Sequence, residues 1–330
     1  MKQLSNLIHK DKNIILNESS FLIPDESCAR NRIPVPAQSA RVNIIALGDV
    51  GGTLLLGLRL LGGDVIDSIG IYDLNDAVLR RYEREINQVT FPDGRKLPKV
   101  KIISENELFD CDMFVFCASK GVPPVGTGGD VRMAQLEANR GLASMYARKA
   151  IDYGYEGLFS VVSDPVDPLC KAVADAGFDS GRIRGYGLGV MNGRARYYAD
   201  RDDRFAQYLH DGRAFGPHGE DLVIADSIKS YNHELSIELT QLTVNSNMVT
   251  RADGFKPYIA PAMSSGALSL IETLKGGWHY SSLYYGCGTS GAFLGCRNRR
   301  TAHGNEVDNL PLDDRLYERI ENAYRNLEKL

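Results

Sequence analysis

The stretch of residues 43–73 constrains the fold of this chain more than any other. It opens with a short apolar run that ends in glycines, among them Gly48 and Gly51. An apolar segment with helical spacing and no proline follows, and a second short apolar run ends in Asp73. A buried strand, a glycine turn, a helix and a second strand with a terminal acid are the parts of a dinucleotide-binding unit.

The glycine turn predicts where a dinucleotide would bind. Glycines let the backbone approach a pyrophosphate, and the following helix offers free N–H groups and the positive end of its dipole. The turn departs from the usual G-x-G-x-x-G pattern, because alanine replaces its first glycine. The alternative is an ordinary βαβ unit whose glycines serve tight packing. The turn residues expected to contact the cofactor are Ala46, Gly48, Asp49, Val50 and Gly51.

Asp73 predicts which dinucleotide is bound. A carboxylate at the end of the second strand accepts hydrogen bonds from the ribose hydroxyls of the adenosine. The same carboxylate would repel a 2′-phosphate, so the sequence favours NAD over NADP as the cofactor.

The rest of the chain predicts an α/β fold in two parts. Strands and helices alternate up to about residue 165, which is typical of a Rossmann-type doubly wound parallel sheet. The later sequence predicts a mixed α/β substrate domain, with a long helix over 221–249. The expected divisions are an N-terminal arm over 1–40, a dinucleotide-binding domain over 41–165 and a substrate domain over 166–330.

The composition excludes several classes of function. The net charge is −4, the pI is near 5.9 and no basic run contains interleaved aromatic residues, so nucleic acid is not an expected partner. No apolar run is long enough to span a bilayer, and the N-terminus lacks the pattern of a signal peptide. The six cysteines include no CxxC pair, which indicates free thiols in a reducing cytoplasm, and no metal site is expected.

A loop rich in glycine and proline, residues 121–130, directly follows a predicted strand. Ligands bind at the carboxyl ends of parallel strands, so this loop is a candidate lid over a bound ligand. The alternative is a surface loop without a function.

Further landmarks lie downstream in a fixed order. They are Arg132 with Asn139 seven positions later, the Ser-Asp-Pro-Val-Asp segment 163–167, the Ala195-Arg196 pair within 189–198, and the turn 216–219 around His218. From residue 42 to the C-terminus, this order and spacing resemble the lactate/malate dehydrogenase family. The resemblance implies an NAD-linked interconversion of a small-molecule 2-oxo acid and an L-2-hydroxy acid, a Rossmann domain, and a homodimer or homotetramer.

The resemblance also implies the roles of two residues at the reacting centre. His218 matches the family's catalytic histidine, a side chain that titrates near physiological pH and can serve as general acid. Arg196 matches the arginine that binds the substrate's carboxylate with a planar, two-pronged donor. The alternatives are a surface histidine in a turn and an arginine that forms a salt bridge within the substrate domain.

Other matches surround this pair. Arg132 matches the lid arginine that polarises the substrate's carbonyl, and its alternative is an exposed charge at the start of a helix. Asn139 matches a residue near the substrate. Ala118 and Ser163 fall where the family contacts its cofactor.

The sequence departs from the family at three positions. Gly193 stands where the family has the aspartate that orients the histidine, Asp164 replaces an asparagine, and Pro217 replaces a glutamate. His218 still needs an acceptor for its second ring nitrogen. Asp164 is expected to supply this acceptor, directly or through a water, and so to share in catalysis. The rival acceptors are Asn192, Glu220 and Asp221.

The loop before Arg132 bears on the substrate. It has no second arginine for a distal carboxylate, and Lys120 is its only cation. A small monocarboxylate, as in L-lactate dehydrogenases, is therefore expected in preference to malate or oxaloacetate. The alternative function is a catalytically weak or inactive NAD-binding relative that serves as a sensor or structural subunit.

Overall fold

The computed structural model describes residues 2–8, 10–24, 35, 39–120 and 131–330, and for 131–135 it describes the backbone alone. The expected lid, 121–130, lies outside the described residues. The side chain of Arg132 lies outside them as well.

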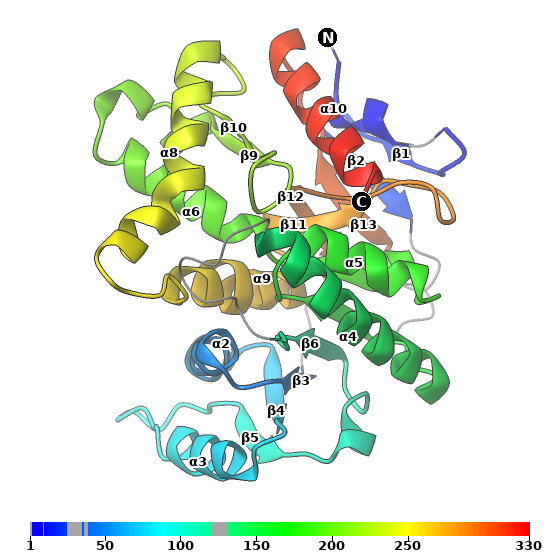
Figure 1. Cartoon of the computed structure of the whole chain (residues 1–330), viewed down its shortest axis with the longest axis vertical. Coiled ribbons are helices and arrows are strands. Elements are labelled where there is room, and N and C mark those ends of the chain that lie inside the picture. The colour runs from blue at the N-terminus through cyan, green and yellow to red at the C-terminus, as the bar shows by residue number, and fades with distance from the viewer. Residues whose placement is uncertain (1, 9, 25–34, 36–38, 121–130) are drawn as a thin grey trace.

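An 11-stranded sheet forms the centre of the described structure (Figure 1). Its strands in spatial order are β1 (Ile15–Leu16), β2 (Ser20–Pro24), β13 (Gly304–Asp308), β12 (Phe293–Thr301), β11 (His279–Tyr284), β8 (Ile183–Gly185), β7 (Leu158–Val161), β6 (Met113–Phe116), β3 (Ala40–Ile45), β4 (Ile66–Tyr72) and β5 (Lys99–Ile102). The strands from β8 to β5 pair in parallel, and those from β1 to β8 pair antiparallel. A separate hairpin joins β9 (Arg213–Phe215) and β10 (Val223–Ala225).

The parallel part of the sheet has the strand order of a dinucleotide-binding fold. If β3 to β8 are numbered 1 to 6 in chain order, their spatial order is 3-2-1-4-5-6. β6 and β7 are buried at every residue, as expected of strands that are covered on both faces. The predicted Rossmann-type sheet is confirmed. Its order reverses between β3 and β6, the place where such folds bind their ligands.

Helices cover both faces of this sheet. The helices of the described residues are α2 (Asp49–Leu61), α3 (Asp76–Asn87), α4 (Val131–Tyr153), α5 (Val166–Asp175), α6 (Leu188–Ala199), α7 (Tyr208–Asp211), α8 (His233–Ala252), α9 (Ser269–Lys275) and α10 (Asp314–Glu328), with the π-helix η5 (Pro261–Leu268) leading directly into α9. Of these, α2, α3 and α9 pack on one face of the parallel strands, and α4 and α5 pack on the other. Successive side chains of β6 point to opposite faces of the sheet. Met113 and Val115 join the apolar cluster of α2 and α9, whereas Phe114 and Phe116 join the cluster of α4 and α5.

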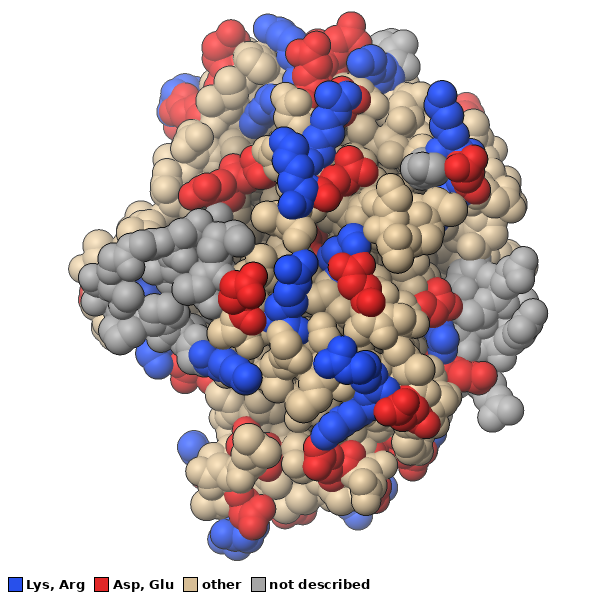
Figure 2. All heavy atoms as spheres, turned by 45° about the vertical axis from the view of Figure 1, so that its right-hand side comes forward, with Lys and Arg blue, Asp and Glu red and all other residues tan. Residues whose placement is uncertain are grey.

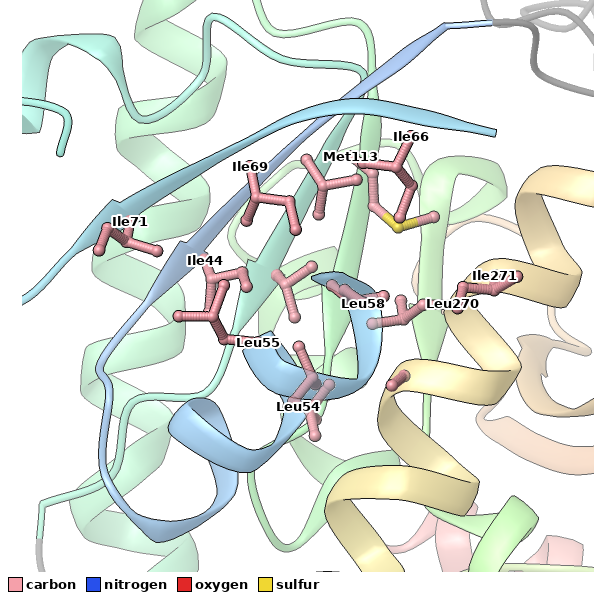
Figure 3. Close-up of a cluster of buried hydrophobic side chains, with 14 of the residues drawn as sticks. Ile44, Leu54, Leu55, Leu58, Ile66, Ile69, Ile71, Met113, Leu270 and Ile271 are labelled. Carbon is pink, nitrogen blue, oxygen red and sulfur yellow. The ribbon is translucent and has the colours of Figure 1, made fainter. Parts of the chain in front are cut away.

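The core around α2 combines residues from distant parts of the chain (Figure 3). Leu54, Leu55 and Leu58 of α2 are fully buried against the parallel strands and against Leu270 of α9. Burying a leucine side chain contributes about 1.5–3 kcal/mol. The C-terminal half of the chain therefore supplies part of the core of the dinucleotide-binding half, and this holds η5 beside the glycine turn.

The prediction of a helix over 221–249 is wrong for its first part. Residues Val223–Ala225 form β10 instead, and α8 begins only at His233. Asn232 caps α8, because its Oδ1 accepts a hydrogen bond from the N–H of Leu235 at 3.1 Å. The residues between β10 and this cap have no regular structure, so the hairpin and α8 are separate elements.

Part of the N-terminal arm pairs within the same chain. β2 lies antiparallel to β13, with Phe21 opposite Val307. Figure 1 shows β1, β2 and α10 at one end of the molecule and α3 at the other. On the face drawn in Figure 2, basic and acidic side chains are intermixed. Among the described helices, none combines the length and apolar character needed to cross a membrane.

Candidate active site

A cavity of about 150 Å³ lies where the order of the parallel strands reverses. Its wall is mostly apolar with a few polar groups, as is common in ligand-binding sites. The lining residues follow β3, β6, β7 and β8 or come from the turn around His218 and from η5: Val50, Cys117, Ser119, Val162, Ser163, Asp164, Val166, Tyr186, Gly187, His218, Pro261 and Ser265. Several of the expected site residues therefore meet in one place, among them Val50, Ser163, Asp164 and His218.

The glycine turn beside the cavity combines a tight contact with an open space. Ala46 takes a left-handed conformation with φ of 67°, where glycine is favoured. A Cβ atom at Gly51 would lie 2.0 Å from the carbonyl oxygen of Ala46, so the start of α2 packs directly on the turn. A Cβ atom at Gly48 would meet nothing within 4 Å. The space above Gly48 is where a phosphate could approach the free N–H groups of α2.

Asp73 is tied to the same turn. Its Oδ2 accepts a hydrogen bond from the N–H of Leu47 at 2.7 Å, and its Oδ1 accepts one from the N–H of Asn75 at 2.9 Å. A carboxylate oxygen has a second lone pair, so both oxygens keep the capacity to accept bonds from ribose hydroxyls. Asp49, in the first turn of α2, pairs with Lys256 at 3.0 Å, which would offset its negative charge if a phosphate bound beside it. The residues present thus fit a dinucleotide.

His218 is oriented by a main-chain oxygen. Its Nδ1 lies 3.1 Å from the carbonyl oxygen of Gly187. A carbonyl oxygen can only accept, so Nδ1 carries the hydrogen and Nε2 is the nitrogen left for a ligand in the cavity. This corrects the expectation that Asp164 accepts the hydrogen bond directly. Asp164 lines the same cavity, but the partner of Nδ1 is Gly187.

The rival acceptors also form other contacts. Oδ1 of Asn192 accepts a hydrogen bond from the hydroxyl of Tyr208 at 2.9 Å. Oδ1 of Asp221 accepts one from the side-chain amide of Asn326 at 3.2 Å. Neither residue is among those that line the cavity in the described part of the chain. A main-chain acceptor such as Gly187 has no signature in a sequence, which is why the search for a side chain missed it.

A second carboxyl group, that of Asp167, contacts the main chain of His218. Asp167 is 3% exposed, and burial raises its pKa to about 7, against hydrogen bonds from the Ser282 hydroxyl and the main-chain N–H of His218 that lower it. Within the described residues, its Oδ1 has no hydrogen-bond partner. Asp167 is the last residue of the Ser-Asp-Pro-Val-Asp segment, so the sequence contained a signal for it.

The structure separates the two arginines of α6. Arg196 is exposed, and its Nη1 donates to the carbonyl oxygen of Leu209 at 3.4 Å on the helix surface. Arg194 is half-buried; burial lowers its pKa, and the carboxylate of Asp164 opposes that shift. Arg194, which the family match passed over, is therefore the arginine of α6 that interacts electrostatically with Asp164 in the cavity wall, although Arg194 itself is not among the lining residues.

Asn139 holds the ends of two strands together. Its Oδ1 accepts from the N–H of Lys120 at 2.8 Å, and its Nδ2 donates to the carbonyl oxygen of Asp164 at 2.9 Å. Its side chain is fully buried and is not part of the cavity wall. Ser163 makes a similar link, because its hydroxyl donates to the carbonyl oxygen of Ala118 at 2.8 Å. These residues fix the loops after β6 and β7 that border the cavity.

Comparisons with known proteins agree on one family. No family model matches the sequence. The chain is 25% identical over 189 residues to an L-lactate dehydrogenase of Corynebacterium jeikeium, an alignment that covers 57% of this chain and 56% of that protein. It is 23% identical over 239 residues to an L-lactate dehydrogenase of Staphylococcus haemolyticus, covering 70% of this chain and 73% of that one. The chain thus spans little more than half the length of the first of these relatives.

Solved structures share the fold over nearly the whole chain. The minor L-lactate dehydrogenase of Enterococcus mundtii has a TM-score of 0.71 at 18% identity, covering 88% of this chain and 97% of that one. The malate dehydrogenase of Aeropyrum pernix has a TM-score of 0.72 at 19% identity, covering 87% and 96%. That of Archaeoglobus fulgidus, in complex with NADH, has a TM-score of 0.70 at 17% identity, covering 88% and 97%.

These two matches to L-lactate dehydrogenases agree with the strand order and with the position of His218 at the strand reversal. In sequence the chain is thus similar to L-lactate dehydrogenases, and it shares the fold of lactate and malate dehydrogenases.

Proposed function

We propose that this protein is an NAD-dependent oxidoreductase that interconverts a 2-oxo acid and an L-2-hydroxy acid. The observation that carries the proposal is the position of His218. Its Nε2 is free to face a ligand in a cavity at the carboxyl ends of the parallel strands, beside the open side of Gly48. A proton donor next to a dinucleotide site is what the reduction of a carbonyl requires.

The cofactor would be held by the glycine turn and Asp73. NADH would supply the hydride to the carbonyl carbon of the 2-oxo acid. The N–H groups at the start of α2 would bind the pyrophosphate, and the carboxylate of Asp73 would accept from the ribose hydroxyls. The Archaeoglobus fulgidus malate dehydrogenase that shares this fold is in complex with NADH, which supports the same cofactor here.

Proton transfer in this proposal runs through Nε2 of His218. The protonated imidazole gives its Nε2 proton to the carbonyl oxygen while the hydride reaches carbon, and a neutral imidazole with its hydrogen on Nδ1 remains. The carbonyl oxygen of Gly187 keeps that hydrogen in place in both states. In the reverse direction the same nitrogen accepts the hydroxyl proton.

Arg194 is our candidate for binding the substrate's carboxylate, in place of Arg196. Arg194 lies within electrostatic reach of Asp164, which lines the cavity, whereas Arg196 is exposed. A guanidinium can bind a carboxylate through two parallel hydrogen bonds. The roles of Arg132 and of the loop 121–130 in closing the site remain predictions.

The preferred substrate in this proposal is a small 2-oxo monocarboxylate. The described wall of the cavity is largely apolar, which suits a small uncharged side chain on the substrate. The related proteins include both lactate and malate dehydrogenases, so substrate preference must be measured on this chain.

The proposal also includes a homo-oligomer. Leu56 of α2 and Leu268 of η5 are exposed apolar side chains, at 39% and 44%, and Ile259 just before η5 is exposed at 63%. Covering apolar surface of this kind between copies of the chain would be favourable. Sedimentation equilibrium would measure the state, and a monomer at all concentrations would contradict this part.

One experiment tests the function. The purified protein is mixed with NADH and, in turn, pyruvate, oxaloacetate, and branched and aromatic 2-oxo acids, and the loss of NADH absorbance is followed. We expect turnover of at least one monocarboxylate, with a loss of about 100- to 10,000-fold in His218→Ala. Tight NADH binding without turnover of any 2-oxo acid, or of the matching hydroxy acids with NAD, would favour a non-catalytic relative instead.

A further inference from the structure

The hydroxyl of Ser265 in η5 and the ring of His218 bond to the same main-chain carbonyl oxygen. The hydroxyl donates to the carbonyl oxygen of Gly187 at 2.8 Å, and the same oxygen accepts from Nδ1 of His218 at 3.1 Å. The hydroxyl in turn accepts from the N–H of Val190 at 2.8 Å. Ser265 is 2% exposed, so these hydrogen bonds are shielded from water.

We infer that Ser265 is a positioning residue for His218, acting through the carbonyl group of Gly187. The inference rests on the proposed function. In a family where an aspartate is expected to orient the histidine, this chain has Gly193, which has no side chain to offer. In this inference, the main-chain carbonyl group accepts the hydrogen bond from Nδ1 that a carboxylate would otherwise accept, and Ser265 holds that carbonyl group in place.

The Gly187 carbonyl group needs support because of where it lies. Gly187 lies between β8 and the first turn of α6, as the N-cap of that helix, and has no side chain that could fix its own peptide group. Ser265 fixes it from a different element, and by accepting from Val190 it also satisfies one of the free N–H groups at the start of α6. Both lone pairs of the Gly187 oxygen are used, one by Ser265 and one by His218.

Packing links the same peptide group to His218. A Cβ atom at Gly187 would lie 2.9 Å from the Cβ of His218 and 3.1 Å from a methyl group of Val166. The main chain of Gly187 thus lies against the base of the histidine side chain. A change in the direction of the Gly187 carbonyl group would therefore alter the tilt of the ring as well as its hydrogen bond.

Removing the Ser265 hydroxyl should affect turnover more than binding. The hydroxyl is occupied by two main-chain groups, so a substrate gains little from it directly. Without it, the Gly187 oxygen loses one partner and the Nδ1 tautomer of His218 loses its fixed acceptor. Fewer molecules then present a correctly aligned Nε2. Removing a residue that orients a metal-binding histidine costs about 10- to 100-fold in affinity or activity, and we expect a loss of the same order here.

The test compares Ser265→Ala with Ser269→Ala. Ser269 is also buried, and its hydroxyl donates to a main-chain oxygen, that of Ser264, at 2.7 Å. Among the described residues, no hydrogen bond connects it to His218 or to Gly187. We expect Ser265→Ala to lower kcat about 10- to 100-fold with a much smaller change in KM. Ser269→Ala should leave both near their original values, and Ser265→Thr, which keeps a hydroxyl, should recover most of kcat.

A second readout does not depend on turnover. Nitrogen NMR with isotope-labelled histidine reports which ring nitrogen of His218 carries the hydrogen, with His218→Gln to assign the signal. We expect the Nδ1–H form in the wild type and a mixture of tautomers in Ser265→Ala. If the wild type reduces no 2-oxo acid, the proposed function fails while this measurement still tests the hydrogen-bond relay.

Two results would overturn the inference. One is a kcat for Ser265→Ala that equals the kcat of Ser269→Ala. The other is an Nδ1–H signal that is the same with and without the hydroxyl. If Ser265→Ala does not fold, Ser265→Cys keeps a side chain of similar size with a weaker donor. Its kcat should then lie clearly below that of the wild type, and wild-type turnover in this variant would count against the role.

Discussion

A Cβ atom at Gly51 would overlap the carbonyl oxygen of Ala46, at a separation of 2.0 Å. The same construction at Gly48, three residues earlier, meets no atom within 4 Å. The two glycines of the turn therefore have different reasons to be glycine. Gly51 is required by the packing of α2 on Ala46, because any side chain there would clash. At Gly48, the absence of a side chain leaves a space that the described residues do not fill.

Gly48→Ala should separate folding from cofactor binding. Gly48 has φ of −69°, a value open to any residue, so alanine should leave the unfolding temperature nearly unchanged. The added methyl group would occupy the approach of a pyrophosphate, so the affinity for NADH should fall 10-fold or more, about 1.4 kcal/mol. Calorimetry and thermal unfolding measure the two effects. Gly51→Ala is the matched control and should destabilise the fold; NADH binding by Gly48→Ala at wild-type affinity would contradict the proposed phosphate site.

Arg194→Lys and Arg196→Lys should differ sharply in kinetics with a 2-oxo acid. A lysine cannot form the two parallel hydrogen bonds of a guanidinium, so Arg194→Lys should raise KM by about 10- to 100-fold. The exposed Arg196 should tolerate lysine with little change. NADH affinity should be the same in both variants. A large effect at Arg196 alone would restore the role that the sequence match gave it.

Asp73→Ala should change both cofactor preference and stability. The wild type is expected to bind NADH more tightly than NADPH, and the variant should narrow that difference because it removes the charge that repels a 2′-phosphate. The N–H groups of Leu47 and Asn75 also lose their acceptors, which costs about 1–3 kcal/mol if water cannot replace them. Asp76→Ala, an exposed acid in the first turn of α3, is the control for charge alone. Equal wild-type affinity for both dinucleotides would refute the assignment of NAD.

Asp167→Asn should remove a pH dependence of stability. The pKa of Asp167 is raised to about 7, above its ordinary value near 3.8, so the folded state retains a proton that the unfolded state releases between these values. As pH rises through that window, the contribution of Asp167 to stability falls, by roughly 1 kcal/mol per pH unit, and it is constant above about pH 7. Asparagine keeps an acceptor oxygen and does not titrate. The unfolding temperature of the variant relative to the wild type should therefore rise from pH 5 to pH 8, and a constant difference would show that Asp167 is charged throughout.

The sequence predicted the parts of the fold that depend on local pattern. The buried runs that became β3, β4, β6 and β7, with the glycine turn after β3, were enough to predict a Rossmann-type sheet, because fully buried parallel strands have few other uses. It also placed His218 among the site residues. The structure then brought His218 to the carboxyl ends of these strands, as the order of the landmarks implied.

The sequence could not assign the arginine of α6. Arg194 and Arg196 are two positions apart, and at 3.6 residues per turn their side chains leave the helix in directions about 200° apart. A match that rests on the Ala195-Arg196 pair fixes the residue type but not which face of α6 meets the cavity. Burial of α6 against its neighbours decides that, and it turns Arg194 inward.

The hydrogen-bond partner of His218 could not be predicted from the sequence for a different reason. Every residue except proline has the same main-chain N–H and carbonyl groups, so no residue type marks the Gly187 oxygen as an acceptor. Ser265 was equally hidden, since it lies 47 positions after His218 and reaches Gly187 only through the packing of η5.

The form of η5 has a consequence for how this site could have diverged. A π-helix has a wider turn than an α-helix, and it is found mostly as short segments at functional sites. Because each wide turn accommodates an additional residue, a single insertion or deletion within η5 would rotate Ser265 relative to Gly187 and leave the leucines of α9 in place on α2. The chemistry around His218 could thus change through a one-residue difference in length, while the residues proposed to bind the dinucleotide stayed the same.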